Sequence, residues 1–248
     1  MCASLAYIFS QDIIDTMCFS AGASITSFSI GLISLAIFIY RESYSFAIFY
    51  LSVILVQFIE YFAHISLEDN DTKLNELAAK SVFALIVFQP VLWALYNALF
   101  FLKDGKGKNK LLAGVGMFLL FSLYFYQSIE SRDGFVIETM VPNCKANVCR
   151  LDWSFLRTNT ILSLLFVLAY IGLFTTTNSL RFPKTGDKSY TLFSMFGTLL
   201  ALAFVYMIFI DKERTPADLL SGFGSIWCIA CALAGPVGVM YPKMVSVY

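Results

Sequence analysis

The chain has 248 residues, of which 58% are hydrophobic and 14% are charged, and its mean hydropathy is +0.74. Soluble domains carry about 25% charged residues, so this composition excludes an ordinary soluble protein and predicts a multi-pass protein of the cell membrane, with the lipid bilayer around it. Lys plus Arg equals Asp plus Glu at 17 each, which leaves no net charge to attract nucleic acid, and no nucleic-acid partner is expected. The 25 Phe and 13 Tyr side chains are interpreted as lipid-facing and interfacial groups rather than as a cofactor site.

The first element in chain order is an N-terminal extension, residues 1–18. Its apolar run is short and has no basic flank, and its acidic residues are Asp12 and Asp15. These features are not typical of a cleavable signal, and they favour a segment lying in the membrane interface.

Seven apolar stretches follow within residues 19–242, each close to the roughly 20 residues that a bilayer-spanning helix needs. They run over residues 19–40, 44–66, 75–102, 111–128, 154–174, 191–210 and 220–242. We therefore expect an all-α bundle of seven transmembrane helices in a single domain, followed by a C-terminal tail at residues 243–248. The third stretch is long enough to tilt or to kink at Pro90, and the fourth is the shortest, so a six-span alternative would make the fourth re-entrant.

The loops predict the orientation, because Lys and Arg concentrate on the cytoplasmic side. The first, third and fifth loops are basic and share one face: they hold Arg41, the Lys-rich segment 103–110, and Arg181 with Lys184 and Lys188. The opposite face receives the acidic segment 67–71, the long loop 129–153 and the charged segment 211–214. This pattern predicts an N-terminus outside and a C-terminus in the cytoplasm.

Cys144 and Cys149 lie close together in the loop 129–153, on the face that the charges assign to the outside. An oxidising compartment allows a disulfide between them, and this is the favoured interpretation. Two free thiols or a metal clip are the alternatives, although no His lies nearby. The other cysteines fall in or near apolar segments, where Cys usually acts as a small hydrophobe.

Polar residues inside the spans are the candidate site. Gln57, Glu60 and His64 share one stripe of the second span, because their spacings are three and four residues. Lys80 lies at a similar depth on the antiparallel third span, where a Glu60–Lys80 contact is expected, and Arg157 opens the fifth span. Such groups are costly in lipid and commonly mark ion or solute pathways, so we predict a polar pocket in the outer half of the bundle. The alternative is that the charges only fasten helices together.

Two further features concern helix packing. Gln89 precedes Pro90 in the middle of the third span, where a proline frees a backbone carbonyl and either lines a cavity or makes an ordinary kink. Small residues at positions 20–24 of the first span and 221–225 of the seventh are typical of close helix contacts. We expect these two spans to pack tightly beside the polar pocket.

Several motifs resemble a family of bacterial polytopic membrane proteins that opens with M-C-F-S-A and has only a domain-of-unknown-function label. The matching residues are Met17-Cys18-Phe19-Ser20-Ala21, Gln57-Phe58-Ile59-Glu60, Pro90 and the segment from Ser225 through Trp227 and Cys228 to Ala232. The resemblance implies no activity. It marks as candidate residues those at the matching positions: Cys18, Ser20, Glu60, Pro90, Trp227 and Cys228. The chain differs from the family in the residues that precede Met17 and in having Gln89 where an aromatic side chain is expected.

These observations favour a transporter or channel-like protein for a small solute or ion, with proton coupling through Glu60. One alternative is a membrane-embedded metal-binding protein or enzyme that combines Glu60 and His64 with Cys18 and Cys228. The other is a seven-helix receptor-like or scaffold protein. A retinal cofactor is not expected, because the last span has no internal Lys, and common enzyme motifs are absent. A homo-oligomer is compatible with a bundle of this size.

Overall fold

The computed structural model describes residues 20–139, 151–181, 235–236 and 239–240. Their elements are α2 (Ala21–Tyr40), α3 (Tyr44–Glu68), α4 (Thr72–Phe100), α5 (Gly105–Glu130), β1 (Ile137–Thr139), β2 (Leu151–Trp153), the 3-10 helix η1 (Ser154–Leu156) and α6 (Thr160–Arg181). Five of these helices are long and apolar enough to cross a bilayer. The prediction of a helical, membrane-type bundle is therefore confirmed for its first five spans. Most of the predicted sixth and seventh spans, the N-terminal extension and the C-terminal tail lie outside the described residues.

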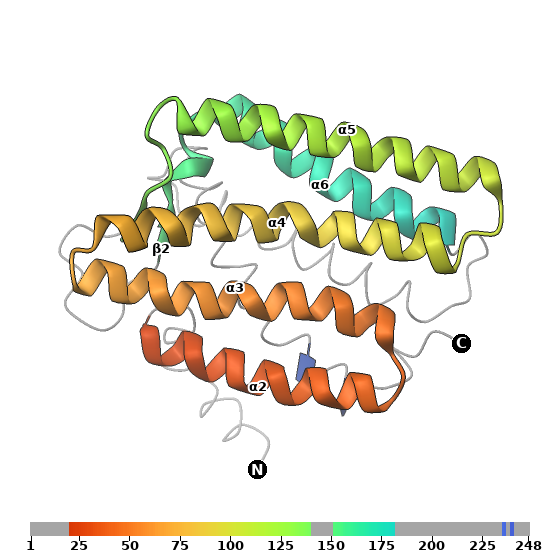
Figure 1. The fold of residues 1–248 in the computed structure, drawn as a ribbon, viewed down its shortest axis with the longest axis horizontal. Coiled ribbons are helices and arrows are strands. Elements are labelled where there is room, and N and C mark those ends of the chain that lie inside the picture. The colour runs from red at the N-terminus through yellow and green to blue at the C-terminus, as the bar shows by residue number, and fades with distance from the viewer. Residues whose placement is uncertain (1–19, 140–150, 182–234, 237–238, 241–248) are drawn as a thin grey trace, which may run out of the picture.

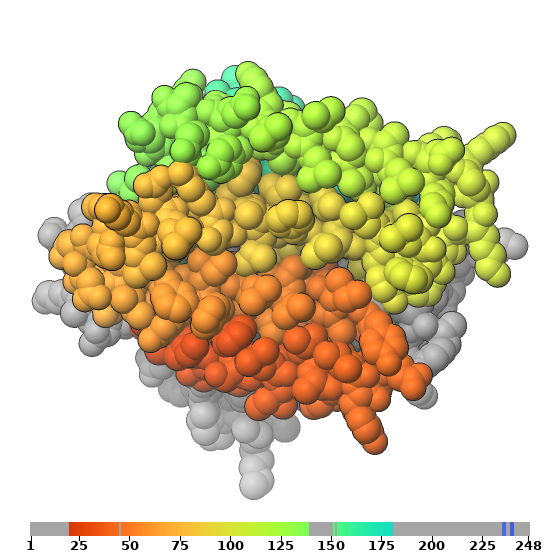
Figure 2. Space-filling model, viewed as in Figure 1, coloured from red at the N-terminus to blue at the C-terminus, as the bar shows by residue number. Residues whose placement is uncertain are grey.

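Successive helices run up and down, and α4 lies at the centre (Figure 1). It packs against α3 on one side and against α5 and α6 on the other, while α2 packs on α3. Figure 2 shows that the side chains of α2 to α5 form one continuous surface on the face in view. Because α4 has neighbours on several sides, polar groups on it can join helices that are distant in the sequence.

Side-chain caps mark where α2 and α5 begin. Ser20 accepts a hydrogen bond from the Ala23 amide at 3.1 Å and thereby caps α2. Asp104 accepts hydrogen bonds from the Lys106 and Gly107 amides, so α5 begins at Gly105 rather than at residue 111. The fourth span is consequently a continuous helix of 26 residues, long enough to cross a bilayer by its length and composition. Helix α4 likewise continues through the buried Pro90 without a break.

The loop 129–153 contains a small antiparallel ladder that the sequence analysis did not predict. Strand β1 pairs with β2 in the register Ile137↔Trp153, Glu138↔Asp152 and Thr139↔Leu151. Burial alternates along the first segment, where Phe135 and Ile137 are buried and Val136 and Glu138 are exposed, and Leu151 and Trp153 are buried on the second. The side chains of Cys144 and Cys149 lie outside the described residues, so their disulfide stays a prediction.

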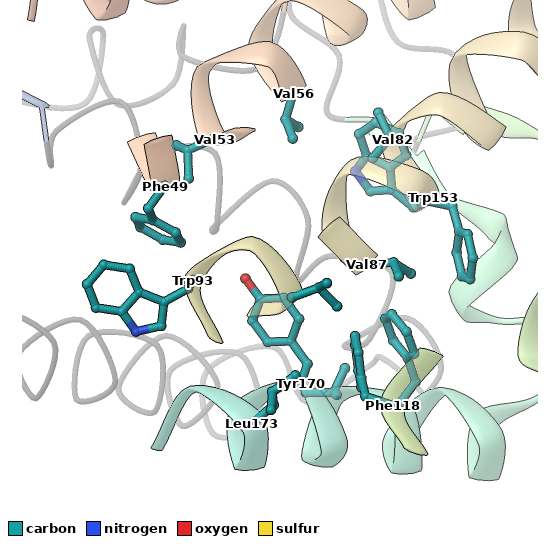
Figure 3. Close-up of a cluster of buried hydrophobic side chains, with 14 of the residues drawn as sticks. Phe49, Val53, Val56, Val82, Val87, Trp93, Phe118, Trp153, Tyr170 and Leu173 are labelled. Carbon is teal, nitrogen blue, oxygen red and sulfur yellow. The ribbon is translucent and has the colours of Figure 1, made fainter. Parts of the chain in front are cut away.

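Many aromatic side chains form the core instead of facing lipid. Phe83 on α4 lies at 5.6–5.9 Å, centroid to centroid, from four rings on α5, the segment before β1, η1 and α6: Phe125, Phe135, Phe155 and Phe166. Figure 3 shows a part of the core in which apolar residues of α3, α4, α5, α6 and β2 meet. The expected lipid-facing position is wrong for these buried rings, whereas Tyr40 and Phe100 are exposed as expected.

The tight contact of the first span is made by Gly31 and not by the expected Gly22. A Cβ at Gly31 would lie only 2.5 Å from Ile54 Cγ2 of α3, while one at Gly22 would meet just its neighbour Ser20 at 3.9 Å. Gly235, from the predicted seventh span, approaches Tyr50 of α3 and Ser34 of α2 just as closely. Gly235 therefore lies beside α2 and α3, while the packing of the seventh span as a whole stays a prediction, because most of it lies outside the described residues.

Candidate functional site

The strongest candidate group lies within α3. The side chains of Gln57, Glu60 and His64 are 2%, 0% and 6% exposed. The Gln57 amide Nε2 donates a hydrogen bond to Glu60 Oε2 at 3.0 Å. Helix α3 continues to Glu68, so Glu60 lies roughly 12 Å below the end of the helix at a rise of 1.5 Å per residue. The structure thus places a fully buried carboxyl group deep inside a helix that is able to span a membrane.

Lys80 does not join this group, and the expected Glu60–Lys80 contact is wrong. Its ammonium group pairs with Glu76 at 2.6 Å and with Glu130 of α5 at 2.8 Å. The same ammonium lies 5.7 Å from the centroid of the Phe135 ring. Lys80 therefore belongs to an ion-pair cluster between α4 and α5, about a quarter exposed at its side chain.

The rotation of α4 explains this result. Asn75 and Gln89 donate hydrogen bonds to Ser66 and Ser52 of α3, and they mark the face of α4 that meets α3. Lys80 follows Asn75 by five residues, which is about 140° around a helix of 3.6 residues per turn. The sequence-based estimate compared only the positions of the two residues along their helices and did not include the direction of each side chain.

Arg157 lies in the turn between η1 and α6 and not inside a span. Its backbone amide donates to the Ser154 carbonyl at 2.9 Å, and α6 begins only at Thr160. The predicted start of the fifth span at residue 154 is wrong, because β2 and η1 occupy residues 151–156. The five residues of the predicted pocket thus belong to three different local environments.

The structure contains a second buried polar network. Of its residues, the sequence analysis named only Gln89. Gln89 is fully buried, and its oxygen accepts a hydrogen bond of 2.7 Å from the Tyr170 hydroxyl of α6. One turn further along α4, the Trp93 indole donates to Asn178 of α6 at 3.1 Å. Figure 3 shows the Tyr170 ring and the Trp93 ring pointing into the same interior region beneath Phe49. Because Gln89 also bonds to Ser52 of α3, this network joins α3, α4 and α6. In the sequence, it was signalled by amide side chains within apolar spans.

A cleft of about 580 Å³ opens at the end of the bundle where α3 meets α4 and α5 meets β1. Five carboxylate side chains line it: Asp71, Glu76, Glu130, Asp133 and Glu138. Its wall includes Asn75, whose side chain is hydrogen-bonded to Ser66 and to the Ile137 backbone. We call it the acidic cleft; the sequence showed only the acidic segment 67–71 that forms part of its rim.

The predicted metal alternative has no support within the described part of the chain. Among these residues no group of three or more His, Cys, Asp and Glu side chains is arranged to hold a metal ion. Cys18, Trp227 and Cys228 lie outside the described residues, so a mixed site with Glu60 and His64 stays a prediction. Of the motif residues, Ser20 has a defined structural role as the cap of α2.

No protein-family model, no curated protein and no solved structure matches the chain. The candidate function therefore rests on the geometry of these residues.

Proposed function

We propose that this protein is a membrane transporter or channel-like protein for a small cation or cationic solute, coupled to proton movement through Glu60. The complete burial of Glu60 in a membrane-type helix carries the proposal. Acidic groups in such positions are costly, and they commonly serve as proton or ion carriers. The Gln57 amide donates a hydrogen bond to one of the carboxyl oxygens of Glu60.

His64 lies one helical turn above Glu60 on the same stripe of α3 and is also buried. A side chain with an imidazole can accept and release a proton near neutral pH. Glu60 and His64 are therefore two successive groups that can carry a proton along the helix axis, and Glu60 lies further from the end of α3.

The acidic cleft supports a cation rather than an anion as the transported species. Five carboxylates line it, and two of them, Glu76 and Glu130, share the single ammonium group of Lys80. A concave surface with one sign of charge raises the local concentration of oppositely charged ions. The cleft acts in this proposal as an entrance, and the proton-coupling step belongs to Glu60.

Proteoliposomes that contain the full chain and a trapped pH-sensitive dye test this proposal. External pulses of Na⁺, K⁺, Mg²⁺ or methylammonium should change the lumen pH for at least one of the four cations, beyond the change in protein-free vesicles. Glu60→Gln should reduce the response by at least about a hundredfold, the lower end of the range for the loss of a positioned proton-transfer group.

Ser122→Ala is the matched control, because Ser122 is also buried in a span but bonds only to the Phe118 carbonyl of its own helix. It should keep the full response. The absence of a protein-dependent pH change with all four cations would contradict the proposal. A Glu60→Gln protein with a normal response and a lowered melting temperature would instead assign Glu60 to helix packing.

A further inference from the structure

A second hollow lies between α5 and α6, well away from Glu60. It has a volume of about 230 Å³, and its body is apolar, with Met117, Phe118 and Phe121 on α5 and Leu173 on α6. Gly114, Ala169 and Gly172 keep it open, because none of them has a long side chain. We call it the α5–α6 groove.

One end of the groove is polar and basic. Lys110 and Thr176 line it there. The two helices are antiparallel, and Gly107 and Gly114 of α5 lie opposite Leu180 and Leu173 of α6, so Lys110 and Thr176 are at the same level. Lys103, Lys106 and Lys108 belong to the same end of α5, where Asp104 is the only acidic residue from 103 to 110.

We propose that the α5–α6 groove binds one anionic phospholipid, with an acyl chain along the apolar body and the phosphate at Lys110 and Thr176. The lining fits the chain of a lipid, since the body of the groove is apolar and Met117 and Leu168 expose apolar side chains on the same two helices. The charge fits an anionic headgroup, because basic side chains at the ends of membrane helices attract anionic lipids. A zwitterionic headgroup gains less from this cluster of lysines.

The structure supplies a pair of substitutions that separates lipid binding from folding. A Cβ at Gly172 would meet no atom of the described residues within 4 Å, and the same holds for Gly116, which lies on α5 outside the groove. Gly172→Phe therefore fills the groove, whereas Gly116→Phe places the same side chain on the helix surface. Both variants have room at the Cβ position.

Native mass spectrometry of the purified full chain, titrated with dioleoylphosphatidylglycerol or dioleoylphosphatidylcholine, tests the proposal. The unmodified chain should bind phosphatidylglycerol at least about tenfold more tightly, as several lysines near an anionic headgroup imply. Gly172→Phe should lose this binding, and Gly116→Phe should keep it. Lys110→Gln should reduce the preference for phosphatidylglycerol by about fivefold, the effect of one lysine at an anionic surface.

Equal binding of the two lipids by the unmodified chain would overturn the proposal. A preference for phosphatidylglycerol that persists in both Gly172→Phe and Lys110→Gln would also overturn it. Lys110→Gln changes an exposed side chain and so keeps the test decisive if Gly172→Phe fails to fold.

Discussion

At the scale of single residues, the side chain of Asn75 hydrogen-bonds to the backbone of β1 in the way that a neighbouring strand would. Its side-chain amide donates to the Ile137 carbonyl at 3.0 Å, and its oxygen accepts from the Ile137 amide at 2.8 Å. The same side chain donates to Ser66 at 3.2 Å. One buried amide therefore joins α3, α4 and β1 and holds the wall of the acidic cleft.

Asn75→Ala should lower the free energy of unfolding by about 2 kcal/mol, because it leaves the buried backbone groups of Ile137 without these bonds. Thermal unfolding in detergent measures the loss, and hydrogen exchange at Ile137 should become faster. Lys73→Ala is the control, since the Lys73 side chain is exposed and only its backbone amide bonds to Asp71. Equal melting temperatures for the two variants would contradict the assigned role.

At the scale of elements, the α2–α3 contact depends on a glycine. The buried Gly31 lets Ile54 approach its backbone, and the rings of Phe38, Phe46 and Tyr50 pack beside this contact. Lipid is as apolar as these side chains, so the helices associate through close packing rather than through exclusion of water. The contact is therefore sensitive to a single added methyl group.

Gly31→Ala should destabilise the protein by about 1–3 kcal/mol, the usual cost of overpacking. The added Cβ would lie 2.5 Å from Ile54 Cγ2, so one of the helices has to move. Gly22→Ala makes the same chemical change in the same helix at an exposed position, and it should be neutral or stabilising, because Ala favours helix over Gly by about 1 kcal/mol. Melting temperatures that fall equally in both variants would refute the packing explanation.

At the scale of the whole molecule, the two ends of the bundle differ in charge. The acidic cleft and the β ladder lie at one end, and Arg41 and the Lys-rich start of α5 lie at the other (Figure 1). Arg41 also donates a hydrogen bond to the Val239 carbonyl at 2.8 Å, which places this C-terminal residue at the basic end. The basic end is expected to face the cytoplasm.

Labelling from outside the cell with a membrane-impermeant maleimide checks this orientation. Glu138→Cys, at the acidic cleft, should gain label relative to the unmodified chain. Lys106→Cys, exposed at the basic end, should gain none until the membrane is made permeable. External labelling of Lys106→Cys would reverse the orientation and the direction of the proposed transport.

Apolar length alone predicted the first five spans, because a bilayer-spanning helix has to be long and continuous. Spacing along one helix likewise predicted that Gln57, Glu60 and His64 share a face. Contacts between helices were harder to predict, since they depend on rotation: Lys80 turned to Glu130 instead of Glu60. The β ladder was missed because its strands are only three residues long, although the alternation of Phe135 and Ile137 was visible.

The central claim is that Glu60 exchanges a proton inside the membrane. Infrared difference spectroscopy of the full chain in lipid, titrated from acidic to alkaline buffer, measures this directly. Subtracting the spectra of Glu60→Gln isolates the carboxyl band of Glu60. We expect a protonated-carboxyl band that disappears as the pH rises, with the same midpoint as the proton flux in proteoliposomes. A Glu60 band that does not change over the pH range in which the flux changes would contradict it.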